Sequence, residues 1–200
     1  MRASLIALFL LPFIGSAPAQ AEGLNIETLA DLHRVSDAQI SPDGRQVVYA
    51  MREVDLEANG GKSDLWLVGA RDRDPAPVRI AASDANESNA RWSADGRAIY
   101  FLSGRSGTSQ VWRYDLATEA LGQVTDLPLG VANLVVAPSG THLAFTMEVY
   151  PDCDSLSCTK DRQIEDAKRL SSGRTYDRLL FRHWDQWEDG LRTRLYALPL

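Results

Sequence analysis

Three short runs in which apolar and polar residues alternate set the pattern of this chain, because each run follows a turn sequence. The runs cover residues 46–50, 97–101 and 141–145. The turn sequences before them are Ser-Pro-Asp-Gly at 41–44, Ser-Ala-Asp-Gly at 93–96 and Ala-Pro-Ser-Gly at 137–140. Glycine accepts positive φ, and the short polar side chain before it caps the turn. Each copy therefore predicts an antiparallel β-hairpin.

The turn sequences begin at 41, 93 and 137, so they are 52 and 44 residues apart, close to the length of a four-stranded propeller blade. A second motif, a five-residue run with a central aromatic residue, recurs once after each turn sequence, at 64–68, 110–114 and 194–198. Short runs that fit outer fourth strands follow its first two copies. The pattern predicts an all-β fold, a partial β-propeller of about three four-stranded blades at about 36–82, 83–127 and 128–200, the last one incomplete.

The third blade carries an insertion of about 40 residues. Its turn glycine, at 140, lies 56 residues before the central aromatic residue of the second motif, at 196. In the second blade the same spacing, from 96 to 112, is 16 residues. The insertion covers about 150–191. Within it, residues 159–170 predict a helix with Thr159 as N-cap. The aromatic run 178–187, followed by Glu-Asp-Gly, predicts a further hairpin.

The first 21 residues have the composition of a signal peptide. A single Arg2 precedes an apolar stretch from Leu5 to Ile14, and Ala19-Gln20-Ala21 forms a small-x-small cleavage site. A stretch of about 10 residues is too short to span a bilayer. We therefore expect cleavage near Ala21 and an exported protein, periplasmic or secreted, with no membrane span. Residues 22–35 then form a leader that contains a short helix or turn.

Composition and charge narrow the class of protein further. Apolar residues make up 44% of the chain and charged residues 24%, which fits a soluble β-rich protein. The net charge is −6 and no basic stripe is present, so nucleic acid is not an expected partner. The sequence predicts no cofactor.

Cys153 and Cys158 are the two cysteines of the chain, and both lie in the insertion. A local disulfide is the favoured interpretation for an even pair in an exported protein, with free thiols as the alternative. A metal site that uses these thiols with Asp152 and Asp154 is disfavoured, because no histidine lies at ligand spacing. We expect no metal.

A closed propeller needs at least four blades, since only a neighbouring blade covers the apolar face of each blade. The sequence therefore predicts that this chain is the N-terminal piece of a longer protein. Its start, Asp-Leu-His-Arg-Val-Ser at 31–36 followed by the turn at 41–44, resembles the propeller of prolyl oligopeptidase-type (S9) serine peptidases. The stretches 145–151 and 176–187, the latter with Arg-His-Trp-Asp-x-Trp, look most like the dipeptidyl-peptidase 5 and acylaminoacyl-peptidase branch. That propeller type has WD40-like or TolB-like blades.

The resemblance implies a two-part enzyme in which a downstream α/β-hydrolase domain holds a Ser, Asp and His triad. A nucleophile elbow needs Gly-x-Ser-x-Gly, and the nearest approach here is Gly-Arg-Ser-Gly-Thr at 104–108. Thr108 replaces the second glycine, so Ser106 is interpreted as a loop serine. We expect no catalytic residue in this chain and no peptidase activity from it alone.

The candidate substrate-facing residues are Trp184, Asp185 and Glu188. If the run 178–187 is a strand, His183, Asp185 and Trp187 share one face. The functional interpretation is that Asp185 or Glu188 meets the free ammonium group of a peptide. The structural interpretation, which we favour, is a packed aromatic hairpin. The paired-Glu motif of dipeptide-cleaving relatives is absent, which leaves exopeptidase specificity open.

The resemblance implies that the chain restricts entry of short peptides and orients them for the downstream hydrolase domain of an exported serine exopeptidase. The alternative is a non-catalytic periplasmic β-propeller scaffold of the TolB type. Such scaffolds carry a separate α/β domain before the propeller, whereas only about 15 residues separate the expected cleavage site from the first hairpin here. The gene beyond codon 200 separates the two: a downstream Gly-x-Ser-x-Gly supports the peptidase.

Overall fold

The computed structural model describes residues 23–71, 76–171, 173, 175–177, 179 and 182–200. Their regular secondary structure is mostly β-strand, in antiparallel sheets, which confirms the all-β prediction. The predicted signal peptide lies outside the described residues. In the described ranges, no helix has both the length and the apolar character that crossing a bilayer requires.

Two sheets have four strands in sequence order. The first sheet contains β1 (Arg34–Ile40), β2 (Gln46–Asp55), β3 (Gly60–Gly69) and β4 (Val78–Ile80). The second sheet contains β5 (Glu87–Trp92), β6 (Ala98–Ser103), β7 (Gln110–Asp115) and β8 (Leu121–Gln123). The chain runs up and down through each sheet, as expected for a propeller blade.

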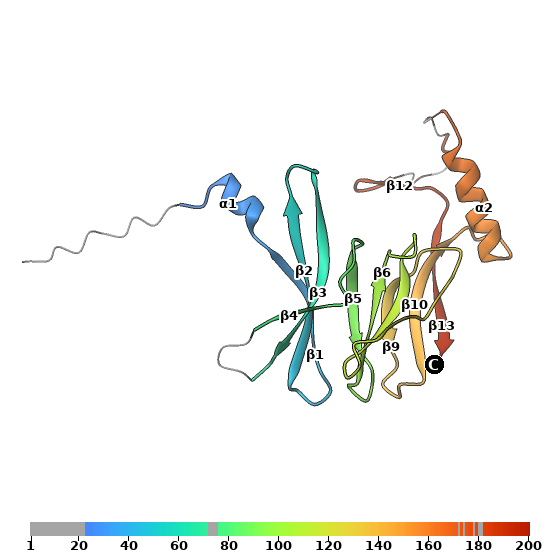
Figure 1. Cartoon of the computed structure of the whole chain (residues 1–200). Helices are drawn as coiled ribbons and strands as arrows, with labels where there is room; N and C mark the ends of the chain where they lie inside the picture. Colours follow the sequence, from blue (N-terminus) through green and yellow to red (C-terminus); the bar gives the residue numbers. More distant parts are fainter. Residues whose placement is uncertain (1–22, 72–75, 172, 174, 178, 180–181) are drawn as a thin grey trace, which may run out of the picture.

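The third sheet has the strand order β13-β10-β9. It is built from β9 (Ala132–Val136), β10 (His142–Val149) and β13 (Arg192–Pro199). Between β10 and β13 the chain forms α2 (Leu156–Ala167) and the small hairpin of β11 (Arg182–His183) and β12 (Gln186–Trp187). Figure 1 shows α2 and this hairpin together at one end of the sheets, opposite the end that carries the β1–β2, β5–β6 and β9–β10 turns.

The three predicted hairpins are confirmed, and the geometry of their turns explains why the turn sequence recurs. Gly44, Gly96 and Gly140 have φ values of 68°, 70° and 72°, which favour glycine. In the first turn, the Ser41 hydroxyl donates to Asp43 Oδ1 over 2.6 Å and the amide of Gly44 donates to the Ser41 carbonyl over 2.9 Å. Ser93 and Asp95 repeat the side-chain bond at 2.6 Å.

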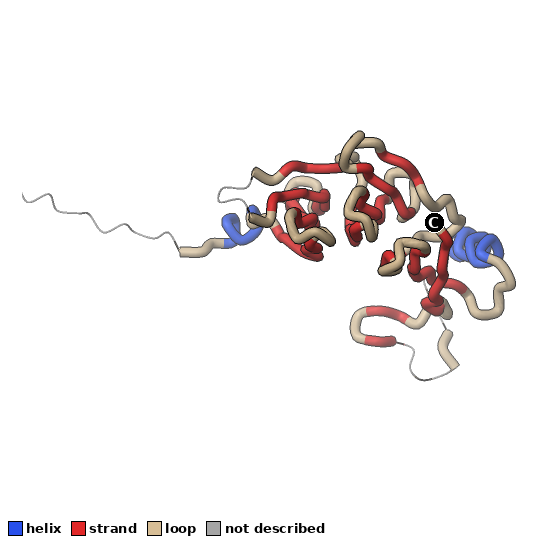
Figure 2. Tube along the Cα trace, turned by 90° about the horizontal axis from the view of Figure 1, so that it is seen from below, coloured by secondary structure: helices blue, strands red, loops and turns tan. Residues whose placement is uncertain are grey.

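The sheets lie side by side and bury their faces against one another (Figure 2). One apolar cluster joins the first and second sheets, and it includes Val48, Leu65, Ile80, Trp92, Ile99 and Phe101. A second cluster joins the second and third sheets, and it includes Leu102, Val111, Leu134, Leu143, Phe145 and Met147. Each fully buried aliphatic or aromatic side chain contributes about 1.5–3 kcal/mol. The core therefore lies between the sheets and not within any one of them.

The helix in the insertion begins earlier than predicted. Ser155 is the N-cap of α2, with extended backbone (φ −145°), and its hydroxyl accepts from the amide of Cys158. Thr159, the predicted cap, lies inside the helix and is fully buried. Its hydroxyl instead accepts from the amide of Tyr150 at the end of β10. In the leader, α1 (Ile26–Asp31) forms the expected short helix.

The hairpin predicted around 178–187 is wrong in its turn position. Trp184 and Asp185 form the turn between β11 and β12, and Trp184 has a positive φ of 52°. The expectation that His183, Asp185 and Trp187 share one strand face is therefore wrong. After Gly190 the chain pairs with β10 over eight residue pairs, from Val149–Arg192 to His142–Pro199, and this long register decides the path of β13.

Candidate functional site

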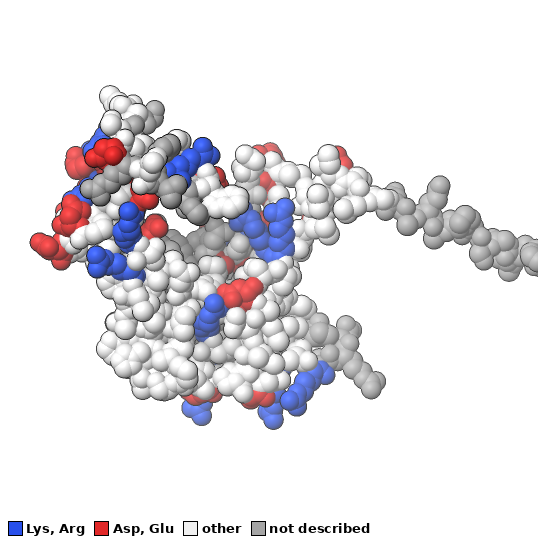
Figure 3. Space-filling model, turned by 180° about the vertical axis from the view of Figure 1, so that it is seen from behind, with Lys and Arg blue, Asp and Glu red and all other residues white. Residues whose placement is uncertain are grey.

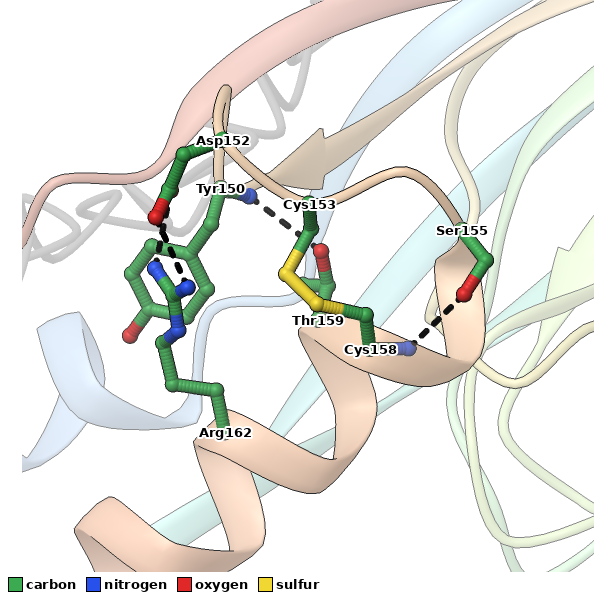
Figure 4. Close-up of a disulfide and its surroundings, with 7 residues drawn as sticks. All are labelled: Tyr150, Asp152, Cys153, Ser155, Cys158, Thr159 and Arg162. Carbon is green, nitrogen blue, oxygen red and sulfur yellow. Dashed lines mark hydrogen bonds and ion pairs between the residues drawn. A yellow bond between two sulfur atoms is a disulfide. The ribbon is translucent and has the colours of Figure 1, made fainter.

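A short neck connects β10 to the insertion, and the disulfide lies in it (Figure 4). Cys153 and Cys158 are bonded, with their Cα atoms 5.6 Å apart. The amide of Tyr150 donates to the Thr159 hydroxyl over 3.3 Å, which ties the end of β10 to the first turn of α2. The neck therefore holds α2 in a defined position relative to the third sheet.

Arg162 strengthens the same connection. Its guanidinium donates to both carboxylate oxygens of Asp152, over 2.9 and 2.8 Å, and its Cζ lies 4.5 Å from the centre of the Tyr150 ring. Such a bidentate pair fixes orientation as well as distance. The hydrogen bonds from Arg162 hold the pKa of the Asp152 carboxyl below its ordinary value. Both side chains are substantially exposed, so the pair positions α2 more than it stabilises the fold.

Beside the neck lies a hollow of about 760 Å³ between α2 and the segment that leads into β13. We call it the insertion hollow, and its lining includes Tyr150, Gln163, Asp166, Tyr176, Glu188 and Asp189. The Tyr150 hydroxyl donates to Asp166 Oδ2 over 3.1 Å. Burial, and then this hydrogen bond, raise the pKa of Tyr150, so the hydroxyl remains a donor at neutral pH.

Three carboxylates line the insertion hollow, and they differ in their partners. Asp166 pairs with Arg169 at 2.9 Å, and Glu188 pairs with Arg192. Asp189 accepts the amide of Leu191 over 2.9 Å. Figure 3 shows charged side chains of both signs gathered around α2 and its flanks. The hollow thus offers carboxylate oxygens and a tyrosine to a small polar cationic group, with arginines at its edge.

The structure separates the three residues predicted to face substrate. Glu188 lines the insertion hollow. Trp184 and Asp185 lie in the β11–β12 turn, and the Trp184 side chain is 85% exposed. Sequence analysis did not select Asp189, which follows Glu188 directly, or Asp166, which lies on the charged side of α2. Asp166 enters the site only because α2 folds back toward Tyr150, and that contact is tertiary.

Ser106 lies in the turn between β6 and β7, as expected for a loop serine. The turn is closed by the amide of Gly107, which donates to the Gly104 carbonyl over 2.9 Å. The Ser106 hydroxyl accepts from Gln123 at 3.5 Å. A nucleophile elbow needs a strand-to-helix turn, and this turn joins two strands of one sheet.

No family model matches the chain. Dipeptidyl-peptidase 5 of Porphyromonas gingivalis is 26% identical over 175 residues, which cover 83% of this chain and 23% of that protein. Dipeptidyl-peptidase 4 of Giardia intestinalis is 29% identical over 187 residues, which cover 84% of this chain and 25% of that protein.

Among solved structures, acylaminoacyl peptidase of Pyrococcus horikoshii superimposes with a TM-score of 0.60 at 18% identity. The superposition covers 86% of this chain and 24% of that chain, and it supports the same fold. The chain spans about a quarter of the length of the curated relatives it matches. The relatives named dipeptidyl-peptidase, which match about 83% of this chain, support its assignment to the prolyl oligopeptidase-type (S9) serine peptidase family.

Proposed function

We propose that this chain is the N-terminal propeller segment of an exported serine exopeptidase, in which it admits and orients short peptides for a downstream α/β-hydrolase domain. The observation that carries the proposal is the match to dipeptidyl-peptidases over more than four fifths of the chain. Acyl transfer through a histidine-activated serine is then the task of the hydrolase domain.

The insertion hollow is the proposed place where the peptide is oriented. A free peptide amino terminus is a small cation with three N–H donors, and Glu188 and Asp189 offer neighbouring carboxylates. Glu188 is already paired with Arg192, so Asp189 is the oxygen donor more readily available to a new cation. In this proposal Asp189 binds the ammonium group, and Glu188 is held in position by Arg192.

The test uses the full-length protein and two dipeptidyl chromogenic substrates, one with a free amino terminus and one acetylated. Asp189→Asn is expected to raise KM for the free-amine substrate about tenfold or more, the range for a lost charged hydrogen bond, and to leave kcat less affected. Glu165→Gln is the matched control, because Glu165 lies on α2, is 70% exposed and pairs with Lys168. It should leave both constants unchanged.

The outcomes distinguish the two parts of the proposal. No turnover of any peptide substrate by the full-length protein would contradict the peptidase assignment. Turnover with an unchanged KM in Asp189→Asn would contradict the role of the insertion hollow alone. Export is tested separately: the N-terminal sequence of the secreted or periplasmic protein is expected to begin after Ala21, and an intact Met1 there would contradict it.

A further inference from the structure

The first strand of each sheet contains one residue in the left-handed region. Asp37, Asn89 and Asn133 have φ values of 49°, 54° and 52°. Each lies four residues before its turn sequence, which begins at 41, 93 or 137. The strand pairing shifts by one residue at each of the three positions, so each residue forms a β-bulge. Asn and Asp are the non-glycine residues that best tolerate this conformation.

These bulge residues connect neighbouring sheets. Strands β1 and β5 contact each other, as do β5 and β9. Asp37 Oδ1 and Oδ2 accept from Arg91 Nη1, over 3.0 and 2.8 Å, and Asn89 Nδ2 donates to Asp37 Oδ2 over 3.4 Å. In the next pair of sheets, Asn89 Oδ1 accepts from the backbone amide of Leu134. Leu134 is fully buried, so its amide requires such a partner.

In both bridges the bulge residue of one sheet accepts a hydrogen bond from the first strand of the next sheet, but the donors differ: Arg91 for Asp37 and the backbone amide of Leu134 for Asn89. Arg91 lies two residues after Asn89, and Val135 lies two residues after Asn133. The charged bulge residue Asp37 therefore binds a cation on the next sheet, whereas the neutral Asn89, which has no arginine at the equivalent position of the third sheet, binds a backbone amide. Asn133 is neutral like Asn89. It should therefore accept a backbone amide from a following sheet.

The face of the third sheet beyond Asn133 is incomplete in the described part of the chain. Asn133 Nδ2 donates to the Thr146 hydroxyl over 2.8 Å, which leaves its carbonyl oxygen available. Val135 and Leu195 are 53% and 74% exposed. By strand register, Leu195 opposite Thr146 corresponds to Leu65 opposite Ala50 and to Val111 opposite Leu102, all four of which are buried against a neighbouring sheet.

We infer that Asn133 Oδ1 forms the next bridge of this series. It accepts the backbone amide of the residue after an Asn or Asp in the first strand of a further four-stranded sheet, which is formed by residues that follow Leu200 in the longer protein and covers this face. The inference continues the interfaces already formed between the first and second and between the second and third sheets. It requires a longer chain, as the fourfold length of the relatives suggests, but it does not require peptidase activity.

The inference predicts a sequence pattern and a hydrogen-exchange result in the full-length protein. The next turn sequence after residue 200 should have Asn or Asp four residues before its first residue. Asn133→Gly keeps the backbone conformation and removes the side chain. It should speed exchange of the amide in the following sheet about two- to tenfold, as Asn89→Gly should for the amide of Leu134.

Two controls isolate the bridge. Asn59→Gly makes the same change at a positive φ of 48° in the exposed β2–β3 turn, and it should leave both amides unchanged. Thr146→Val removes the other hydrogen bond of Asn133, together with the bond from the Thr146 hydroxyl to the Ala132 carbonyl, but leaves Asn133 Oδ1 in place; it should have a smaller effect than Asn133→Gly. Unchanged exchange in Asn133→Gly, or a following turn without the Asn or Asp, would overturn the inference. If Asn133→Gly instead converts a dimer to a monomer in light scattering, the face binds a second copy of the chain and the inference is equally overturned.

Discussion

At the scale of single residues, the second sheet contains a buried ion pair between Glu87 and Arg105. Glu87 is fully buried at the start of β5, and its Oε1 accepts from Arg105 Nη2 over 2.9 Å and from the Ser83 and Ser103 hydroxyls over 2.6 and 3.0 Å. Arg105 also lies over the ring of Trp112 at 5.1 Å. Removal of one partner from a buried pair leaves an uncompensated charge, and that costs more than the pair itself contributes.

Arg105→Met is therefore expected to lower the free energy of unfolding by about 3 kcal/mol or more. Urea denaturation followed by tryptophan fluorescence measures the change. The double variant Arg105→Met with Glu87→Met should recover part of the loss, because neither charge then remains buried. Arg45→Met is the control, since Arg45 pairs with Asp43 on the surface. Equal losses in the control and in Arg105→Met would contradict the interpretation.

At the scale of elements, α2 depends on its neck as well as on its own sequence. The disulfide, the Ser155 cap and the Asp152–Arg162 pair all act on its first two turns. None of these connections touches the far end of the helix, where Lys168 and Arg169 pair with residues of α2 itself. Loss of these connections should therefore loosen the first two turns of α2 and leave the Tyr150–Asp166 hydrogen bond as a contact of its last turn.

Replacement of both cysteines by serine is expected to lower the free energy of unfolding by about 2 kcal/mol, the chain-entropy value for so short a loop. Thermal unfolding with and without a reductant measures it, and a thiol assay establishes the bonded state. Reductant should destabilise the wild type and have no effect on the double variant. Ser155→Ala, which removes the cap alone, should cost about 1 kcal/mol. Identical stability with and without reductant in the wild type would contradict the prediction.

At the scale of the whole molecule, stacking of sheets supplies the core. The same apolar positions occur six and eight residues after the start of each turn sequence: Val47 and Tyr49, Ile99 and Phe101, Leu143 and Phe145. In the second and third sheets these residues are buried against the preceding sheet. In the first sheet they are only half-buried, because no sheet precedes it among the described residues.

Phe101→Ala should therefore cost about 3–5 kcal/mol, the value for truncation of a buried aromatic residue. Tyr49→Ala at the equivalent position should cost clearly less in this chain. The comparison of the two by urea denaturation tests whether burial between sheets, and not the position in the hairpin, determines stability. A Tyr49→Ala loss as large as that of Phe101→Ala would contradict this.

The sequence alone determined the hairpins, the period of the sheets and their apolar faces, because turn glycines and alternation are local signals that recur along the chain. Those signals could also have revealed the bulge residues Asp37, Asn89 and Asn133, which hold one fixed place before each turn. Only the tertiary structure decided that Ser155 caps α2, that Trp184 and Asp185 form a turn, and that Asp166 meets Tyr150. The physical reason is that the partners lie far away in the sequence: Tyr150 at the end of β10 binds Thr159 and Asp166 of α2, and β13 pairs with β10 over its full length.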